Sequence, residues 1–111
     1  MAAKANIVID QGADFSTSIT VTDDAGDAVN LTGYTGSGQI RKHFTSNTAI
    51  NFDVFFASPR TSGVVSISLD RSTTSSIEAG RYVYDVEITN AANTRSRLVE
   101  GIATITPEVT R

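Results

Sequence analysis

Apolar and polar residues alternate in several short stretches of the chain, which is the pattern of β-strands with one face in a core. The clearest stretch is 80–89, and a polar turn at 90–93 connects it to a return run at 94–106. One face of the first strand is aromatic or aliphatic, formed by Tyr82, Tyr84, Val86 and Ile88. We predict that this hairpin forms the centre of the fold.

Similar patterns elsewhere predict further short strands, each bounded by turn residues. They lie at 6–10, 15–22, 35–44, 50–56 and 65–69. No amphipathic helix pattern is present, although Asp70 or Ser72 could cap a single helical turn. About seven short strands without a βαβ rhythm indicate an all-β, antiparallel sandwich.

The return strand has an irregularity at Gly101. Ile102 and Ile105 beyond it fall on opposite faces of an ideal strand. A glycine at such a change of phase commonly marks a β-bulge, so we expect the strand to bend at Gly101. Pro107 cannot donate a hydrogen bond to a ladder, so the residues from there on are expected at an edge or in a tail.

Residues 78–84, Glu-Ala-Gly-Arg-Tyr-Val-Tyr, resemble the corner between strands E and F of immunoglobulin-like domains. In those domains a tyrosine near the start of strand F bonds back to the preceding loop, a role that would bury Tyr82 beside that loop. Tyr84 stands where antibody domains carry a cysteine. Two ordinary core aromatics would explain the same residues, because aromatic side chains favour strands. We predict a single immunoglobulin-like domain spanning 1–111, with short N- and C-terminal tails.

Composition and charge narrow the function classes. The net charge is −3, and the arginines are dispersed among acidic residues, which disfavours nucleic-acid binding. There is no cysteine, and hence no disulfide framework or thiolate metal site. No stretch has the apolar length of a signal peptide or a membrane span, so we expect synthesis in a cytoplasm, without processing and without membrane contact.

Candidate catalytic and metal-binding residues are sparse. The acidic cluster at 23–27 could suggest calcium, but it lacks the rest of a calcium-loop pattern, and we expect a solvated turn without metal. His43 is the only histidine, and its neighbours offer neither a partner nor a pocket. The serines of 70–77 lack a base and a Gly-x-Ser-x-Gly turn. We therefore expect no cofactor and no enzymatic activity.

Several stretches together resemble a family of small bacteriophage virion proteins and the N-terminal β-sandwich domains of phage baseplate and tail proteins. They are Asn-Ile-Val-Ile-Asp-Gln-Gly-Ala-Asp-Phe at 6–15, Asn-Leu-Thr-Gly-Tyr at 30–34, Gln-Ile-Arg-Lys at 39–42, Ala-Gly-Arg-Tyr-Val-Tyr-Asp-Val at 79–86, Val-Glu-Gly at 99–101 and Pro-Glu-Val-Thr-Arg at 107–111. In that family the domain is similar to a module that attaches a receptor-binding part to the tail. No such part follows here, so the resemblance implies an adaptor, decoration or wedge component.

This resemblance implies a virion protein made in the host cytoplasm. Its partners would be other tail, baseplate, neck or capsid proteins, in a symmetric homo- or hetero-oligomer. The segments best placed for such contacts are 1–6 and 107–111, because Pro107 ends the ladder while Val109 and Arg111 still offer an apolar group and a forked donor. The alternative is a stand-alone carbohydrate- or cell-surface-binding module, which would need exposed aromatic residues, and the chain has no tryptophan.

Overall fold

The central hairpin of the structure consists of β8 (Gly80–Thr89) and β9 (Arg95–Thr106), as the alternation predicts. The computed structural model describes residues 3–110. In these residues the hairpin belongs to a six-stranded sheet with the order β1-β9-β8-β4-β5, in which β2 also pairs with β9. The other strands of this sheet are β1 (Ala3–Lys4), β2 (Ile7–Asp10), β4 (Thr35–Arg41) and β5 (Ile50–Asn51).

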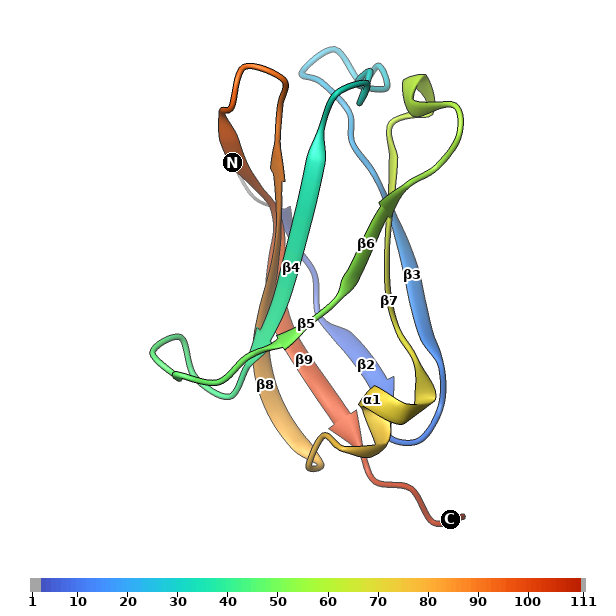
Figure 1. Cartoon of the computed structure of the whole chain (residues 1–111), viewed down its shortest axis with the longest axis vertical. Coiled ribbons are helices and arrows are strands. Elements are labelled where there is room, and N and C mark those ends of the chain that lie inside the picture. Colours follow the sequence, from blue (N-terminus) through green and yellow to red (C-terminus); the bar gives the residue numbers. More distant parts are fainter. Residues whose placement is uncertain (1–2, 111) are drawn as a thin grey trace.

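A three-stranded sheet with the order β3-β7-β6 packs against the larger one, so the molecule is a β-sandwich (Figure 1). Its strands are β3 (Phe15–Thr20), β6 (Asp53–Phe56) and β7 (Val64–Leu69). Two short helices connect strands, namely the 3-10 helix η1 (Arg60–Ser62) and α1 (Arg71–Ser75). Asp70 is the N-cap of α1, as the sequence suggests, and its Oδ1 accepts from the Thr73 amide at 2.8 Å.

The N-terminal strand departs from the antiparallel prediction. Ala3 pairs with Val99 and Ile7 with Ala103, and both β1 and β2 run parallel to β9. A parallel pair cannot be joined by a tight hairpin, but these strands are the first and last of the chain and need no direct connection. The sandwich is therefore antiparallel except at this edge.

The predicted strand at 50–56 is divided between the two sheets. β5 pairs with β4 in the larger sheet, whereas β6 pairs with β7 in the smaller one. Phe52 lies between them, buried, with its ring 6.0 Å from that of Tyr84 in an edge-to-face arrangement. A Cβ on Gly36 of β4 would lie 2.7 Å from Cγ1 of Val54, so the glycine lets the crossing strand approach closely.

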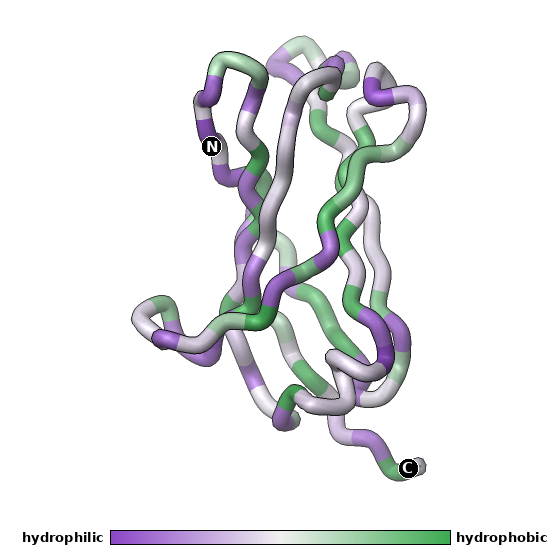
Figure 2. Tube along the Cα trace, in the orientation of Figure 1, coloured by the Kyte–Doolittle hydropathy of each residue, from purple (hydrophilic) through white to green (hydrophobic). Residues whose placement is uncertain are grey.

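The core lies between the inner faces of the two sheets, where the alternating apolar residues meet. Figure 2 shows the alternation of hydropathy along the strands. The largest fully buried apolar side chains are Ile9, Leu31, Ile40, Ile67, Ile105, Val65 and Val86. On β8 the period-two pattern therefore identifies the core-facing side correctly, since Tyr84, Val86 and Ile88 are buried.

The bulge of the central hairpin lies at Leu98 of β9, so its prediction at Gly101 was wrong. Pairing continues through Gly101, which lies opposite Tyr84, and the register shifts between Val86 and Glu87. Leu98 is the extra residue on β9. The change of phase therefore precedes the glycine, and the odd-numbered residues from 99 to 105 keep the same face.

A glycine is needed at 101 for another reason, which is that the backbone between β1 and β2 passes close to it. A Cβ at this position would lie 2.0 Å from the carbonyl oxygen of Ala5. The Tyr84 hydroxyl donates to the same oxygen at 2.6 Å, and the side-chain oxygen of Asn6 accepts from the Ile102 amide at 3.1 Å. The absence of a side chain at Gly101 thus lets the chain cross close to β9 between β1 and β2.

Tyr82 makes the bond that the immunoglobulin corner implies. Its hydroxyl donates to the Glu78 carbonyl at 2.7 Å, four residues back along the chain. The residue is half-buried and not buried as predicted, and Lys42 lies over its ring with Nζ 4.7 Å from the ring centroid. The residue therefore fixes the loop before β8 more than it fills the core.

Candidate functional site

The C-terminal segment leaves the sandwich directly after β9. The strand ends at Thr106, one residue before Pro107, as predicted. Pro107 is exposed, and Val109 is 94% exposed, so both project from the end of the molecule (Figure 1). Arg111, the third residue predicted to make contacts, lies outside the described residues.

Glu108 anchors this segment between two exposed neighbours. Its amide donates to Oε1 of Gln11 at 3.0 Å, and its side chain is half-buried. Gly12 lies directly beneath, because a Cβ on it would fall 1.9 Å from a carboxylate oxygen of Glu108. Gln11 also donates to the Ile77 carbonyl at 2.8 Å. The exposed residues 107 and 109 therefore flank a residue whose position is fixed by its contacts with Gln11 and Gly12.

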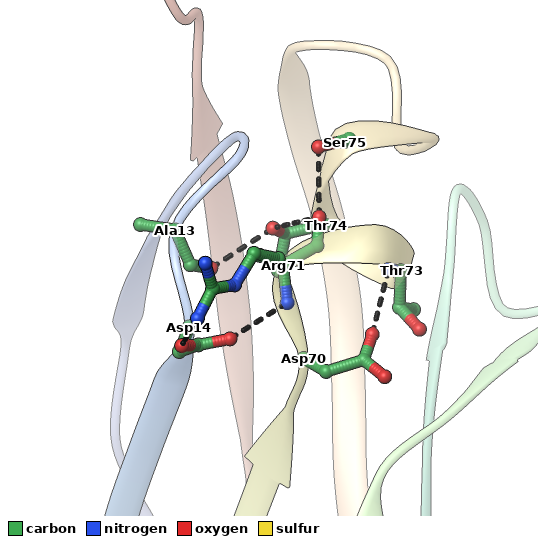
Figure 3. Close-up of polar contacts among 7 residues, drawn as sticks. All are labelled: Ala13, Asp14, Asp70, Arg71, Thr73, Thr74 and Ser75. Carbon is green, nitrogen blue, oxygen red and sulfur yellow. Dashed lines mark hydrogen bonds and ion pairs between the residues drawn. The ribbon is translucent and has the colours of Figure 1, made fainter.

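The C-terminal segment contacts the end of the sandwich at which α1 packs against the β2–β3 turn. Thr74, the only polar residue among residues 3–110 to be classed as buried, accepts from the Gly12 amide at 3.1 Å and donates to the Ala13 carbonyl at 2.9 Å. Asp14 accepts from the Arg71 amide at 2.8 Å (Figure 3). Sequence reasoning missed these contacts, because Thr74 stands in a run of serine and threonine typical of a loop.

A recess of about 290 Å³ lies on the outer face of the larger sheet. Asp85 and Glu100 face each other across β8 and β9, and Arg97 bridges them, with Nε 3.5 Å from Asp85 and Nη1 2.8 Å from Glu100. Phe44 stands at its margin and is 85% exposed. The recess thus combines an aromatic ring with a paired set of charges.

The two carboxylates of the recess differ in their pKa values. Partial burial raises the pKa of Asp85 above its ordinary value, and the neighbouring Glu87 adds to the increase, although Arg97 opposes it. The hydrogen bond from Arg97 lowers the pKa of Glu100. Arg97 is therefore bound mainly to Glu100, the shorter of its two contacts.

The other sequence candidates lie apart from one another. The Asp23 carboxylate accepts from the amides of Ala25 and Asp27 at 3.0 Å each, so the acidic cluster is a solvent-exposed turn. His43 is exposed in the loop after β4. Among residues 3–110 there is no group of three or more histidine, aspartate or glutamate residues that could hold a metal ion. Over the same residues no helix is both long and apolar enough to cross a membrane.

Comparison with known proteins gives a fold and no family. No protein-family model matches the chain, and no curated protein matches its sequence. Among solved structures, the filamin domain of Lin-41 is similar with a TM-score of 0.49 and 16% identity, over 89% of this chain and 82% of that one. The SrpA adhesin of Streptococcus sanguinis, solved as an R347E mutant, is similar with a TM-score of 0.53 and 15% identity, over 92% of this chain.

The chain spans 55% of the length of that adhesin. Neither structure is described as a bacteriophage protein. At such low identity the likeness concerns the fold alone. The chain has an immunoglobulin-like β-sandwich fold. The two packed sheets and the hydrogen bond of the Tyr82 hydroxyl to the Glu78 carbonyl are both features of that fold.

Proposed function

We propose that the chain is a non-enzymatic structural protein of a bacteriophage virion, which assembles through contacts with other virion proteins. Its resemblance in short motifs to phage baseplate and tail domains supports the virion role. A single observation supports assembly most directly. The C-terminal segment presents Pro107 and Val109 to solvent while Glu108 holds it against Gln11.

An exposed apolar side chain on an anchored segment is suited to binding a partner. Val109 loses little freedom when it is covered, because the residue before it is already fixed, and burying it is favourable. A short segment of this kind buries little area alone. Repetition around a symmetric particle would supply the affinity through several simultaneous contacts.

Deletion of 107–111 tests this proposal. The truncated protein should keep its β-sheet circular dichroism, because β9 ends before Pro107, and its incorporation into virions should fall. Val109→Asp should lower incorporation about tenfold, as loss of a central contact does. Val8→Asp is the matched control, since Val8 is another exposed valine, 62% accessible, on the N-terminal edge.

Mass spectrometry of purified virions measures the ratio of this protein to the others. If the truncated protein is present at the wild-type ratio, the tail is not the contact. If the wild-type protein is absent from virions, the virion role itself is wrong.

A cell-surface-binding module is the second candidate, favoured by exposed aromatic residues. Phe44 is 85% exposed beside the recess and Phe55 is 51% exposed on β6. An aromatic ring next to polar groups is a usual carbohydrate surface. The SrpA adhesin, which is similar to this chain in fold, is named as a protein of adhesion, so we weigh surface binding as a candidate. Binding to a glycan array that Phe44→Ser abolishes and Phe55→Ser retains would favour this function over assembly.

A further inference from the structure

The chain stays attached to the sandwich after β9 has ended. Thr106 Oγ1 donates to Oδ1 of Asp10 at 2.7 Å, and the Thr106 carbonyl accepts from the Gln11 amide at 3.0 Å. Two residues further on, the Glu108 amide donates to Oε1 of Gln11 at 3.0 Å. Asp10 and Gln11 therefore hold the chain on both sides of Pro107.

Pro107 itself restricts the chain between these two attachments. Its ring fixes φ at about −65° and favours an extended conformation at the residue before it. Because a proline has no amide hydrogen, Pro107 cannot donate to a ladder with β2. The Gln11 side chain then supplies an acceptor for the next amide, that of Glu108. The run from Thr106 to Glu108 therefore has little conformational freedom, although only its first residue belongs to the strand.

Ile77 determines which way the Gln11 side chain points. A backbone carbonyl can only accept hydrogen bonds, so the amino group Nε2 of Gln11 faces the Ile77 carbonyl, at 2.8 Å. Oε1 is then directed to the Glu108 amide, which can only donate. Ile77 follows α1 and is buried in the main core. Gln11 thus links the core at one end of its side chain to the C-terminal segment at the other.

We propose that Gln11 is the positioning residue of the C-terminal contact, an inference that rests on the proposed assembly role. By holding the Glu108 amide, Gln11 presents the exposed Pro107 and Val109 to a partner in one orientation. A segment that is ordered before binding loses less conformational entropy on binding than a mobile one. Gln11 therefore strengthens the contact by acting through Glu108.

NMR relaxation of the free protein tests the positioning. Gln11→Leu keeps a side chain of similar size but removes both hydrogen-bonding groups, so the amides of 108–110 should show the low heteronuclear NOE values of a mobile terminus. Gln39→Leu is the matched control, because Gln39 is also half-buried and its side chain is hydrogen-bonded at both ends, to Asn51 and Arg41 at 2.9 Å each. The control should leave these NOE values unchanged.

Incorporation into virions, measured by mass spectrometry, tests the consequence for binding. Gln11→Leu should lower incorporation about fivefold, which corresponds to ordering one more residue on binding. Gln39→Leu should leave incorporation unchanged. Deletion of 107–111 should have the larger effect, since it removes the contact itself as well as its fixed position.

Hydrogen exchange of the wild-type protein gives a readout that does not require the variant to fold. The Glu108 amide should be more protected than that of Thr110. Equal protection of the two amides would overturn the inference. So would unchanged NOE values at 108–110 in Gln11→Leu, or a mobile segment with wild-type incorporation.

Failure of the proposed function gives a different result. If deletion of 107–111 leaves incorporation unchanged, the C-terminal contact is wrong. The NOE values of the free protein still decide in that case whether Gln11 positions the segment.

Discussion

Gly101 lies opposite Tyr84 on the neighbouring strand, and the tyrosine side chain reaches past it to the carbonyl of Ala5. The two residues act together, because a side chain at 101 would occupy the place of the Ala5 carbonyl. Tyr84 is buried, so its hydroxyl needs a partner, and the first strand supplies one. A glycine and a tyrosine thus fix where the N-terminal strand docks.

Gly101→Ala should therefore destabilise the protein by about 1–3 kcal/mol, because the backbone of Ala5 must move to admit the methyl group. Chemical denaturation measures the change in the free energy of unfolding. In a chain that begins at Ile7 the obstructing carbonyl is gone, and the same substitution should cost much less. Equal costs in the two chains would show that the glycine serves another purpose.

At the scale of elements, α1 shows how a local signal specifies a structure. Asp70 precedes a run of serine and threonine, and the structure places its carboxylate on the amide of Thr73. This hydrogen bond lowers the pKa of Asp70 below its ordinary value of 3.8. Folding therefore favours the ionised carboxylate. Its hydrogen bond stabilises the fold fully above the ordinary pKa of 3.8, and this stabilisation is lost as the pH falls through the lowered pKa of the folded state.

Asp70→Ala should lower the melting temperature at pH 7, because the first turn of α1 loses its acceptor. The difference from wild type should shrink as the pH falls through the lowered pKa of the folded state, where the wild-type carboxyl is itself protonated. Asp70→Asn is the control, since it keeps an oxygen acceptor without the charge. A difference that stays constant down to pH 2 would contradict the role of the ionised carboxylate in the cap.

The strands and turns could be predicted from the sequence because their signals are local. The alternation at 50–56 gives no sign that the strand changes sheets, since its inner residues face the same core in both. The parallel pairing of β2 with β9 is also hidden, because no hairpin turn connects them. The bonds of Thr74 and Gln11 that hold the C-terminal segment arise only when distant parts of the chain meet.

The whole molecule measures 44 Å along its longest axis, and the C-terminal segment leaves at one end of it (Figure 1). The first and last strands run in the same direction side by side, from Ala3 beside Val99 to Asp10 beside Thr106. The chain therefore enters beside the start of this contact and leaves beyond its far end.

This geometry determines how the protein responds to mechanical force. Tension between the two ends of the chain pulls β2 and β9 in opposite directions along their length. The hydrogen bonds between them are then loaded in shear and share the load, so several must fail together. Antiparallel terminal strands would have both ends of the chain at one side, and the same tension would peel their bonds apart singly. The parallel pairing of the first and last strands should therefore raise the force needed to unfold the sandwich by pulling on its two ends. This resistance would be useful in an assembly that bears load.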